Sequence, residues 1–210
     1  MISTYDAFID ADMCRALINR ADQLWPILPT YEKDLCKNFK EYIDSQKESA
    51  HFIDSSRGNR TQIFFDRNDP LVLPIREKIA ELTGLPIEHQ TRPLLSVYPE
   101  GGSYAYHYDY FDVPPPIEQG GQRLKSFILY LNEDYEGGIT YFKDHKLFVS
   151  PETGKMITFD TVKPEFWKFV GSERSYRNGK NPESYHKVIP VRKGKKYTLI
   201  LWIREGVPSI

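Results

Sequence analysis

Short strand-like segments separated by turns fill the chain from about residue 92 to residue 203, and they constrain the fold most. From about residue 92 the pattern changes to a period of two, and Leu94–Tyr98 and Ser126–Leu131 are rich in apolar, β-branched and aromatic residues, which is typical of strands. Further segments of this kind cover residues 103–111, 139–142, 146–149, 155–159, 186–191 and 196–203. We expect the last two segments to form a hairpin across Arg192–Lys195.

Before residue 92 the apolar residues recur instead at helical spacing. This spacing predicts helices over residues 10–25, 31–47 and about 70–83, with Asp10 or Asp12 capping the first. Helices followed by many short strands favour an α+β domain that contains a β-sandwich or a jelly-roll barrel. The length of 210 residues suits a single domain with a substantial core.

Composition excludes several classes of protein. The formal net charge of −1 gives no overall attraction to nucleic acid or to an anionic membrane, and no apolar run approaches the ~20 residues that span a bilayer. The N-terminus lacks the features of a signal peptide, and two cysteines, Cys14 and Cys36, make no disulfide framework. We expect a cytoplasmic protein that binds neither nucleic acid nor membrane. The oligomeric state stays open.

Three residues with metal-binding side chains point to a function. His107 and Asp109 form a His-x-Asp pair in the segment 103–111, where alternate side chains share a face, and His186 lies far downstream. Two imidazoles and one carboxylate on one face of a metal leave the opposite positions open, as in non-haem Fe(II) oxygenases. A lone His-x-Asp pair is more often structural. Here Lys196 follows His186 by ten residues, where it can hold the far carboxylate of a 2-oxo acid bound to that iron.

Several longer segments match the pattern of one known family. They are Asn59–Gln62, Pro70–Pro86, Tyr98–Tyr104, His107–Phe111, Ile128–Asn132 and Tyr135–Phe142, together with the spacing of His186, Pro190, Gly194, Lys196 and Trp202. With these segments the chain resembles the prolyl 4-hydroxylase type of Fe(II)/2-oxoglutarate dioxygenases over nearly its whole length. The resemblance implies one domain, residues 1–210: a double-stranded β-helix (jelly roll) over 91–210, with largely helical support from 1–90.

The resemblance also implies roles for nine residues. In it, His107, Asp109 and His186 bind Fe(II) and are the catalytic centre, and Lys196 pairs with the C5 carboxylate of 2-oxoglutarate. Tyr98 and Thr140 add hydrogen bonds to that carboxylate. The substrate-binding positions of the family fall on Tyr104, Arg123 and Trp202. The resemblance further leaves open a role for ascorbate.

The implied reaction is hydroxylation of a prolyl residue in a peptide or protein, with O2 consumed and succinate and CO2 released. Two departures leave the substrate open: Gln62 replaces the usual Ser, and the polar stretch 161–184, which we expect to be a mobile cover, is long. One alternative is the same chemistry on a free amino acid, a lysyl residue or a small metabolite. Another is a non-catalytic barrel that binds metal or sugar.

Overall fold

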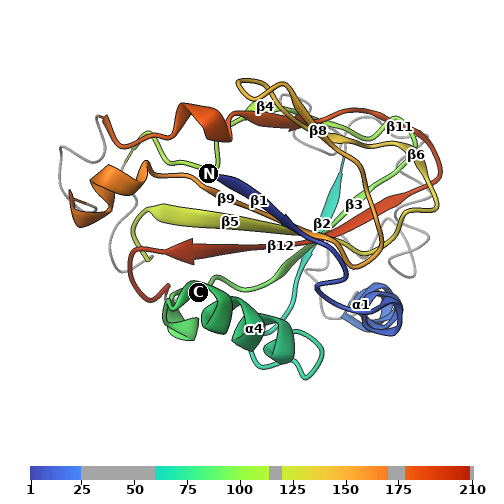
Figure 1. The fold of residues 1–210 in the computed structure, drawn as a ribbon. Coiled ribbons are helices and arrows are strands. Elements are labelled where there is room, and N and C mark those ends of the chain that lie inside the picture. The colour runs from blue at the N-terminus through green and yellow to red at the C-terminus, as the bar shows by residue number, and fades with distance from the viewer. Residues whose placement is uncertain (25–59, 114–119, 170–177, 209–210) are drawn as a thin grey trace.

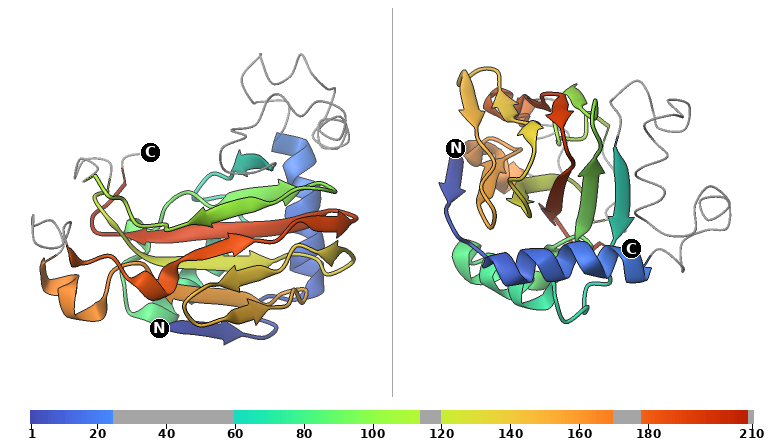
Figure 2. Two further views of the ribbon diagram at one scale, coloured as in Figure 1. Left: turned by 90° about the horizontal axis from the view of Figure 1, so that it is seen from above. Right: turned by 90° about the vertical axis from the view of Figure 1, so that its right-hand side faces the viewer.

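The computed structural model describes residues 1–24, 60–113, 120–169 and 178–208. Within these ranges two antiparallel sheets form a barrel-like sandwich, and two α-helices cover the outer face of the larger sheet (Figures 1 and 2). This arrangement confirms the α+β class and the jelly-roll core with supporting helices. The predicted helix over 31–47, and Cys36, lie outside the described residues.

The larger sheet has, in the described ranges, six strands in the order β1-β9-β5-β12-β3-β2. In that order their bounds are Ile2–Tyr5, Met156–Asp160, Arg123–Tyr130, Lys196–Arg204, Leu94–Tyr98 and Thr61–Phe64. The outer strands β1 and β2 come from the first third of the chain, where the sequence analysis expected helices. Each of these strands has four residues, so a pattern of alternating inward and outward side chains repeats only twice. Two repeats are too few to identify a strand from the sequence.

The smaller sheet has the order β4-β10-β7-β8 in the described residues. These strands span Tyr104–His107, His186–Val188, Thr140–Phe142 and Leu147–Val149, and a separate ladder joins β6, Glu136–Gly137, to β11, Val191–Lys193. The predicted hairpin of 186–191 with 196–203 is therefore wrong. β10 pairs with β4 and β7, whereas β12 pairs with β3 and β5. Pro190 has no N–H for a ladder, and there the chain leaves the smaller sheet.

Two α-helices close the other side of the larger sheet. α1 spans Ala11–Leu24 and α4 spans Leu73–Thr83, and the described residues add the 3-10 helices η2, η4 and η5 at Ile87–His89, Pro164–Phe169 and Pro182–Ser184. The N–H of Met13 donates to Asp10 Oδ1 at 2.7 Å, so Asp10 is the cap of α1. None of the helices in the described ranges is long and apolar enough to cross a membrane.

The main core lies between the larger sheet and these helices. Leu17 of α1 and Ile79 of α4 are fully buried there against apolar side chains of the strands. Along β12 the odd-numbered residues Leu199, Leu201 and Ile203 join this core. The even-numbered residues must then point to the opposite face, between the two sheets, because successive strand residues alternate. This alternation positions the site.

Candidate active site

His107, Asp109 and His186 come together between the sheets. His107 ends β4, His186 begins β10, and the two residues are direct partners in the ladder. The possible ligand atoms of the three side chains lie within 4.8 Å of one another. Asp109 lies just beyond β4 rather than in a strand, contrary to the prediction for 103–111. The ladder between β10 and β4 ends at the pair of His186 with His107, so Asp109 lies beyond the last paired residue of β4.

Hydrogen bonds fix the tautomers of both histidines. His107 Nδ1 lies 2.9 Å from the carbonyl oxygen of Ala105, and His186 Nδ1 lies 2.8 Å from that of Ser184. A carbonyl oxygen only accepts, so each Nδ1 carries the proton and each Nε2 presents a lone pair. Burial, with His107 as a neighbour, lowers the pKa of His186 to about 4, so this imidazole is neutral and able to bind a metal at pH 7.

The carboxylate of Asp109 is oriented by two donors. Ser126 Oγ donates to Oδ2 at 2.7 Å and Trp202 Nε1 donates to the same oxygen at 3.0 Å. Oδ1 lies 3.5 Å from His107 Nε2. Burial by itself raises the pKa of Asp109, but the neighbouring His107 and His186 hold it well below its ordinary value. Three acceptor atoms with no proton between them fit a divalent cation, and two nitrogens with one oxygen suit Fe(II).

Lys196 lies at one end of the same cavity, which has a volume of about 490 Å³. Its side chain is 1% exposed, pairs across the strands with Tyr98, and donates from Nζ to the carbonyl of Gly138 at 2.7 Å. Burial lowers the pKa of Lys196 to about 7. In the described part of the chain no carboxylate pairs with it. A buried ammonium of this kind needs an anionic partner, and the far carboxylate of a 2-oxo acid would supply one.

Hydroxyl groups surround the Lys196 end of the cavity. Tyr98 and Thr140 line it, and Thr140 Oγ1 accepts a hydrogen bond from Tyr130 at 2.7 Å. Thr198 lines it too, and its buried hydroxyl has no hydrogen-bond partner among the described residues. The sequence analysis missed Thr198, although the alternation along β12 places it on the same face as Lys196.

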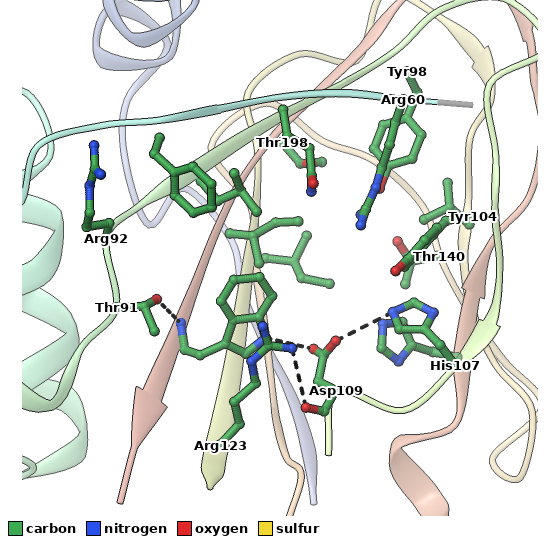
Figure 3. Close-up of a pocket in the computed structure, with 18 of the residues that line it drawn as sticks. Arg60, Thr91, Arg92, Tyr98, Tyr104, His107, Asp109, Arg123, Thr140 and Thr198 are labelled. Carbon is green, nitrogen blue, oxygen red and sulfur yellow. Dashed lines mark hydrogen bonds and ion pairs between the residues drawn. The ribbon is translucent and has the colours of Figure 1, made fainter. Parts of the chain in front are cut away.

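The three predicted substrate residues also line the cavity, and in Figure 3 Tyr104 lies near Thr140 while Arg123 lies near Asp109. The guanidinium of Arg123 lies 3.8 Å above the Trp202 ring, and its Nη1 donates to the carbonyl of Asp109 at 3.4 Å. Tyr104 lies edge-on to His107, with ring centroids 4.1 Å apart. All three side chains are within reach of a molecule bound over the metal ligands. Trp202 has a second role that the sequence did not reveal, because its N–H also orients Asp109.

Arg60 is a cavity residue to which the sequence analysis gave no role. Its guanidinium lies 3.6 Å above the ring of Tyr104, and Nη1 donates to the hydroxyl of Tyr98 at 3.3 Å. The segment Asn59–Gln62 drew attention in the sequence only as a point of resemblance. Nothing local in it shows that Arg60 reaches the cavity, since this depends on the pairing of β2 with β3.

Comparison with known proteins gives the family. The family model described as the 2OG-Fe(II) oxygenase superfamily matches residues 93–204, which is more than half of the chain. The chain belongs to this superfamily. Its matched segment contains all three metal-ligand candidates and Lys196, so the superfamily and the three-residue site together imply Fe(II) and 2-oxoglutarate.

Relatives of this superfamily member include two plant enzymes. Probable prolyl 4-hydroxylase 9 of Arabidopsis thaliana is 30% identical, with 94% of this chain and 66% of the relative aligned. Prolyl 4-hydroxylase 1 of the same plant is 29% identical, with 69% of this chain and 51% of the relative aligned. The chain thus spans less than two thirds of the length of these relatives.

Solved structures confirm the fold of this 2OG-Fe(II) oxygenase. The viral collagen prolyl hydroxylase of Paramecium Bursaria Chlorella virus-1, in its 2OG complex, matches with a TM-score of 0.67. The alignment has 23% identity and covers 97% of this chain and 95% of the viral one. A prolyl-4-hydroxylase of Pseudomonas putida matches with a TM-score of 0.58, at 18% identity and with 97% and 91% coverage. At these identities the likeness shows the fold alone.

Proposed function

We propose that the protein uses Fe(II), 2-oxoglutarate and O2 to hydroxylate a prolyl residue in a peptide or protein. The observation that carries the oxygenase chemistry is the position of Lys196. A buried lysine without a carboxylate partner in the described residues lines the same cavity as the His107, Asp109 and His186 site. The names of the relatives support proline as the target. A non-catalytic barrel would have no use for this lysine.

In this proposal each side chain of the site has a separate role. When bound, Fe(II) and 2-oxoglutarate would supply the activation of O2: one oxygen atom would enter succinate, formed with CO2 from the 2-oxo acid, and the other would be available for the substrate C–H bond. His107, His186 and Asp109 hold the metal, while Ser126 fixes the carboxylate ligand. Lys196 neutralises the far carboxylate of the co-substrate. The apolar walls of the cavity exclude water from the reacting groups.

The same chemistry on a free amino acid, a lysyl residue or a small metabolite is the second candidate. The cavity favours it in one respect, since about 490 Å³ also accommodates a co-substrate with a small molecule. Such a substrate would sit among Tyr104, Arg123 and Trp202 without extending beyond the cavity rim.

The test measures succinate formation from 2-oxoglutarate with Fe(II) and O2, first alone and then with proline-rich peptides. Mass spectrometry of the peptides would detect a gain of one oxygen on proline. We expect both signals with the wild-type protein and neither with His186→Ala, which lacks one metal ligand. A protein that makes succinate with free amino acids but ignores every peptide would support the second candidate. Absence of succinate under all conditions would contradict both.

A further inference from the structure

The charges that line the cavity are strongly unbalanced. Among the described lining residues Asp109 is the only carboxylate. The cationic lining residues are Lys196 and four arginines, namely Arg60, Arg92, Arg123 and Arg204. An excess of fixed positive charge in a cavity attracts anions and raises their local concentration.

The metal and the co-substrate do not remove this imbalance. Fe(II) and 2-oxoglutarate carry opposite formal charges of equal size, and the charge of Asp109 cancels that of Lys196. The described cavity lining therefore holds no further carboxylate that could offset the charge of the arginines. Arg123 and Arg204 have other contacts as well, including the ring of Phe111, over which both guanidinium groups lie at 4.6 and 5.0 Å.

Arg92 is the arginine best placed to meet a substrate. It precedes β3, and the neighbouring Thr91 bonds to Trp202 through backbone N–H and carbonyl at 2.9 Å. Tyr98, which pairs with Lys196, lies six residues further along, or about 20 Å in an extended strand. In Figure 3 Arg92 accordingly lies on the opposite side of the cavity from Tyr98, Tyr104 and Thr140. It is thus remote from the co-substrate end.

The guanidinium of Arg92 is held in place but keeps donors for a ligand. Its Nε donates to the carbonyl of Phe65 at 3.1 Å, and its Cζ lies 5.5 Å from the centroid of the half-exposed Phe64 ring. No carboxylate among the described residues pairs with it. A molecule that fills the cavity also covers this partly buried group and removes water from it, which is unfavourable unless the molecule brings an opposite charge.

We propose that the substrate carries a carboxylate next to the hydroxylated residue, and that Arg92 binds this carboxylate. The planar fork of a guanidinium matches the two oxygens of a carboxylate. This inference rests on the proposed function and narrows its substrate class to acidic ones. Two sources supply the same chemistry: an acidic side chain flanking the target in a peptide, or the α-carboxylate of a free amino acid.

The first experiment changes only the substrate. Peptides of one length, with Glu, Gln or Lys flanking a central proline, are titrated against wild-type protein holding Fe(II) and 2-oxoglutarate without O2. Fluorescence anisotropy reports binding. We expect the Glu peptide to bind about tenfold more tightly than the Gln peptide, and 0.5 M salt to reduce this preference. Equal binding of all three peptides, together with equal binding of free proline and prolinamide, would overturn the inference.

The second experiment changes Arg92. Arg92→Gln should abolish the preference for Glu, Arg92→Lys should retain most of it, and Arg92→Glu should favour the Lys peptide. Lys143→Gln is the matched control: it removes one positive charge from an exposed side chain outside the cavity lining and should leave the preference unchanged. A preference that survives in Arg92→Gln would overturn the assignment to Arg92.

Further comparisons distinguish the two possible sources of the carboxylate. They also separate failure of the Arg92 assignment from failure of the proposed function. Preference for free proline over prolinamide, lost in Arg92→Gln, would identify an α-carboxylate as the partner of Arg92. Preference for the Glu peptide would identify a flanking side chain. Succinate formation that persists without any preference for acidic substrates contradicts only the role of Arg92. Failure to form succinate with any substrate contradicts the proposed function itself.

Discussion

At the scale of single residues, Lys196 combines a benefit for binding with a penalty for folding. Its ammonium is buried and donates a hydrogen bond to the carbonyl of Gly138, and the rings of Tyr98 and Tyr130 lie 5.3 and 5.0 Å from Nζ. In the described residues no carboxylate pairs with it. We predict that Lys196→Met stabilises the ligand-free protein by about 1–3 kcal/mol, because the buried charge is gone. The same change should weaken 2-oxoglutarate binding by one to two decades or more. Chemical unfolding and calorimetric titration measure the two effects.

The neighbouring lysine is the control for this prediction. Lys195 precedes Lys196 and is more exposed. Lys195→Met should leave both stability and 2-oxoglutarate affinity almost unchanged. A loss of affinity in Lys195→Met, with none in Lys196→Met, would show that the assignment of the co-substrate ligand is wrong.

The pKa of Lys196 also predicts a pH dependence. Burial lowers this pKa to about 7 in the folded protein, against an ordinary value of 10.5. Between these values the unfolded chain binds the proton that the folded chain has lost, so the contribution of Lys196 makes stability rise with pH from about 7 to about 10.5. Urea unfolding of the ligand-free protein should show this rise. Lys196→Met should lack it, and an identical pH profile in both proteins would contradict the prediction.

The two donors to Asp109 give a third prediction. Ser126→Ala and Trp202→Phe each remove one hydrogen bond to Oδ2 and keep most of the packing. We expect each variant to lose about tenfold or more in Fe(II) affinity, as is usual when a partner of a metal ligand is removed. Equilibrium metal titration measures this. Thr158→Ala, on the adjacent strand and outside the cavity lining, should bind iron as the wild-type protein does.

The role of a single residue was predictable from the sequence only where its side chain has a distinctive chemistry, such as metal binding. His107, Asp109 and His186 have metal-binding side chains, and the structure places them together. Arg92 and Ser126 have no such mark. The positions of both residues at the cavity depend on pairings between distant strands, and a single sequence does not show which strands pair.

At the scale of elements, β12 connects the core to the cavity. Leu201 points into the fully buried core, whereas Ile200 points into the cavity. We predict that Leu201→Ala lowers the free energy of unfolding by about 2–5 kcal/mol, because it leaves a space in a close-packed core. Ile200→Ala should cost less stability and should change substrate or co-substrate affinity instead. Comparing unfolding midpoints with binding constants for the two variants tests this division.

The reverse result would show that the register of β12 is shifted by one residue, since such a shift exchanges the two faces of a strand. The sequence predicted this strand well, as it did β3, because runs rich in apolar, β-branched and aromatic residues are typical of buried strands. The sequence analysis did not predict the strands with which β10 pairs. A hairpin is the simplest pairing of neighbouring segments, but β10 must lie beside β4 for His186 to reach His107.

At the scale of the whole molecule, the bound metal and co-substrate would join the two sheets. His107 and His186 belong to the smaller sheet, while Lys196 and Trp202 belong to β12 in the larger one. The order of helices and strands in the sequence predicted an α+β domain with a sandwich or a jelly-roll barrel, and the family resemblance narrowed this to the jelly roll. The contribution of β1 and β2 to the larger sheet did not, because both strands are short and their partners lie far along the chain.

Because the metal and the co-substrate would contact both sheets, we predict that they stabilise the folded protein. We also predict that 2-oxoglutarate stabilises it strongly only when Fe(II) is bound. Fe(II) and then 2-oxoglutarate, each at about 100 times its Kd, contribute about 2.7 kcal/mol apiece, and for a domain of about 200 residues each contribution raises Tm by roughly 5–10 °C. Differential scanning fluorimetry without O2 measures this. 2-Oxoglutarate alone should give a much smaller rise, because its chelating end then lacks the metal. Lys196→Met should keep the increase due to Fe(II) and lose the further increase due to 2-oxoglutarate, whereas His186→Ala should lose both. If 2-oxoglutarate raised the Tm of His186→Ala as much as that of the wild type, its binding would not depend on the metal site, and the cavity would not be the shared site that this fold suggests.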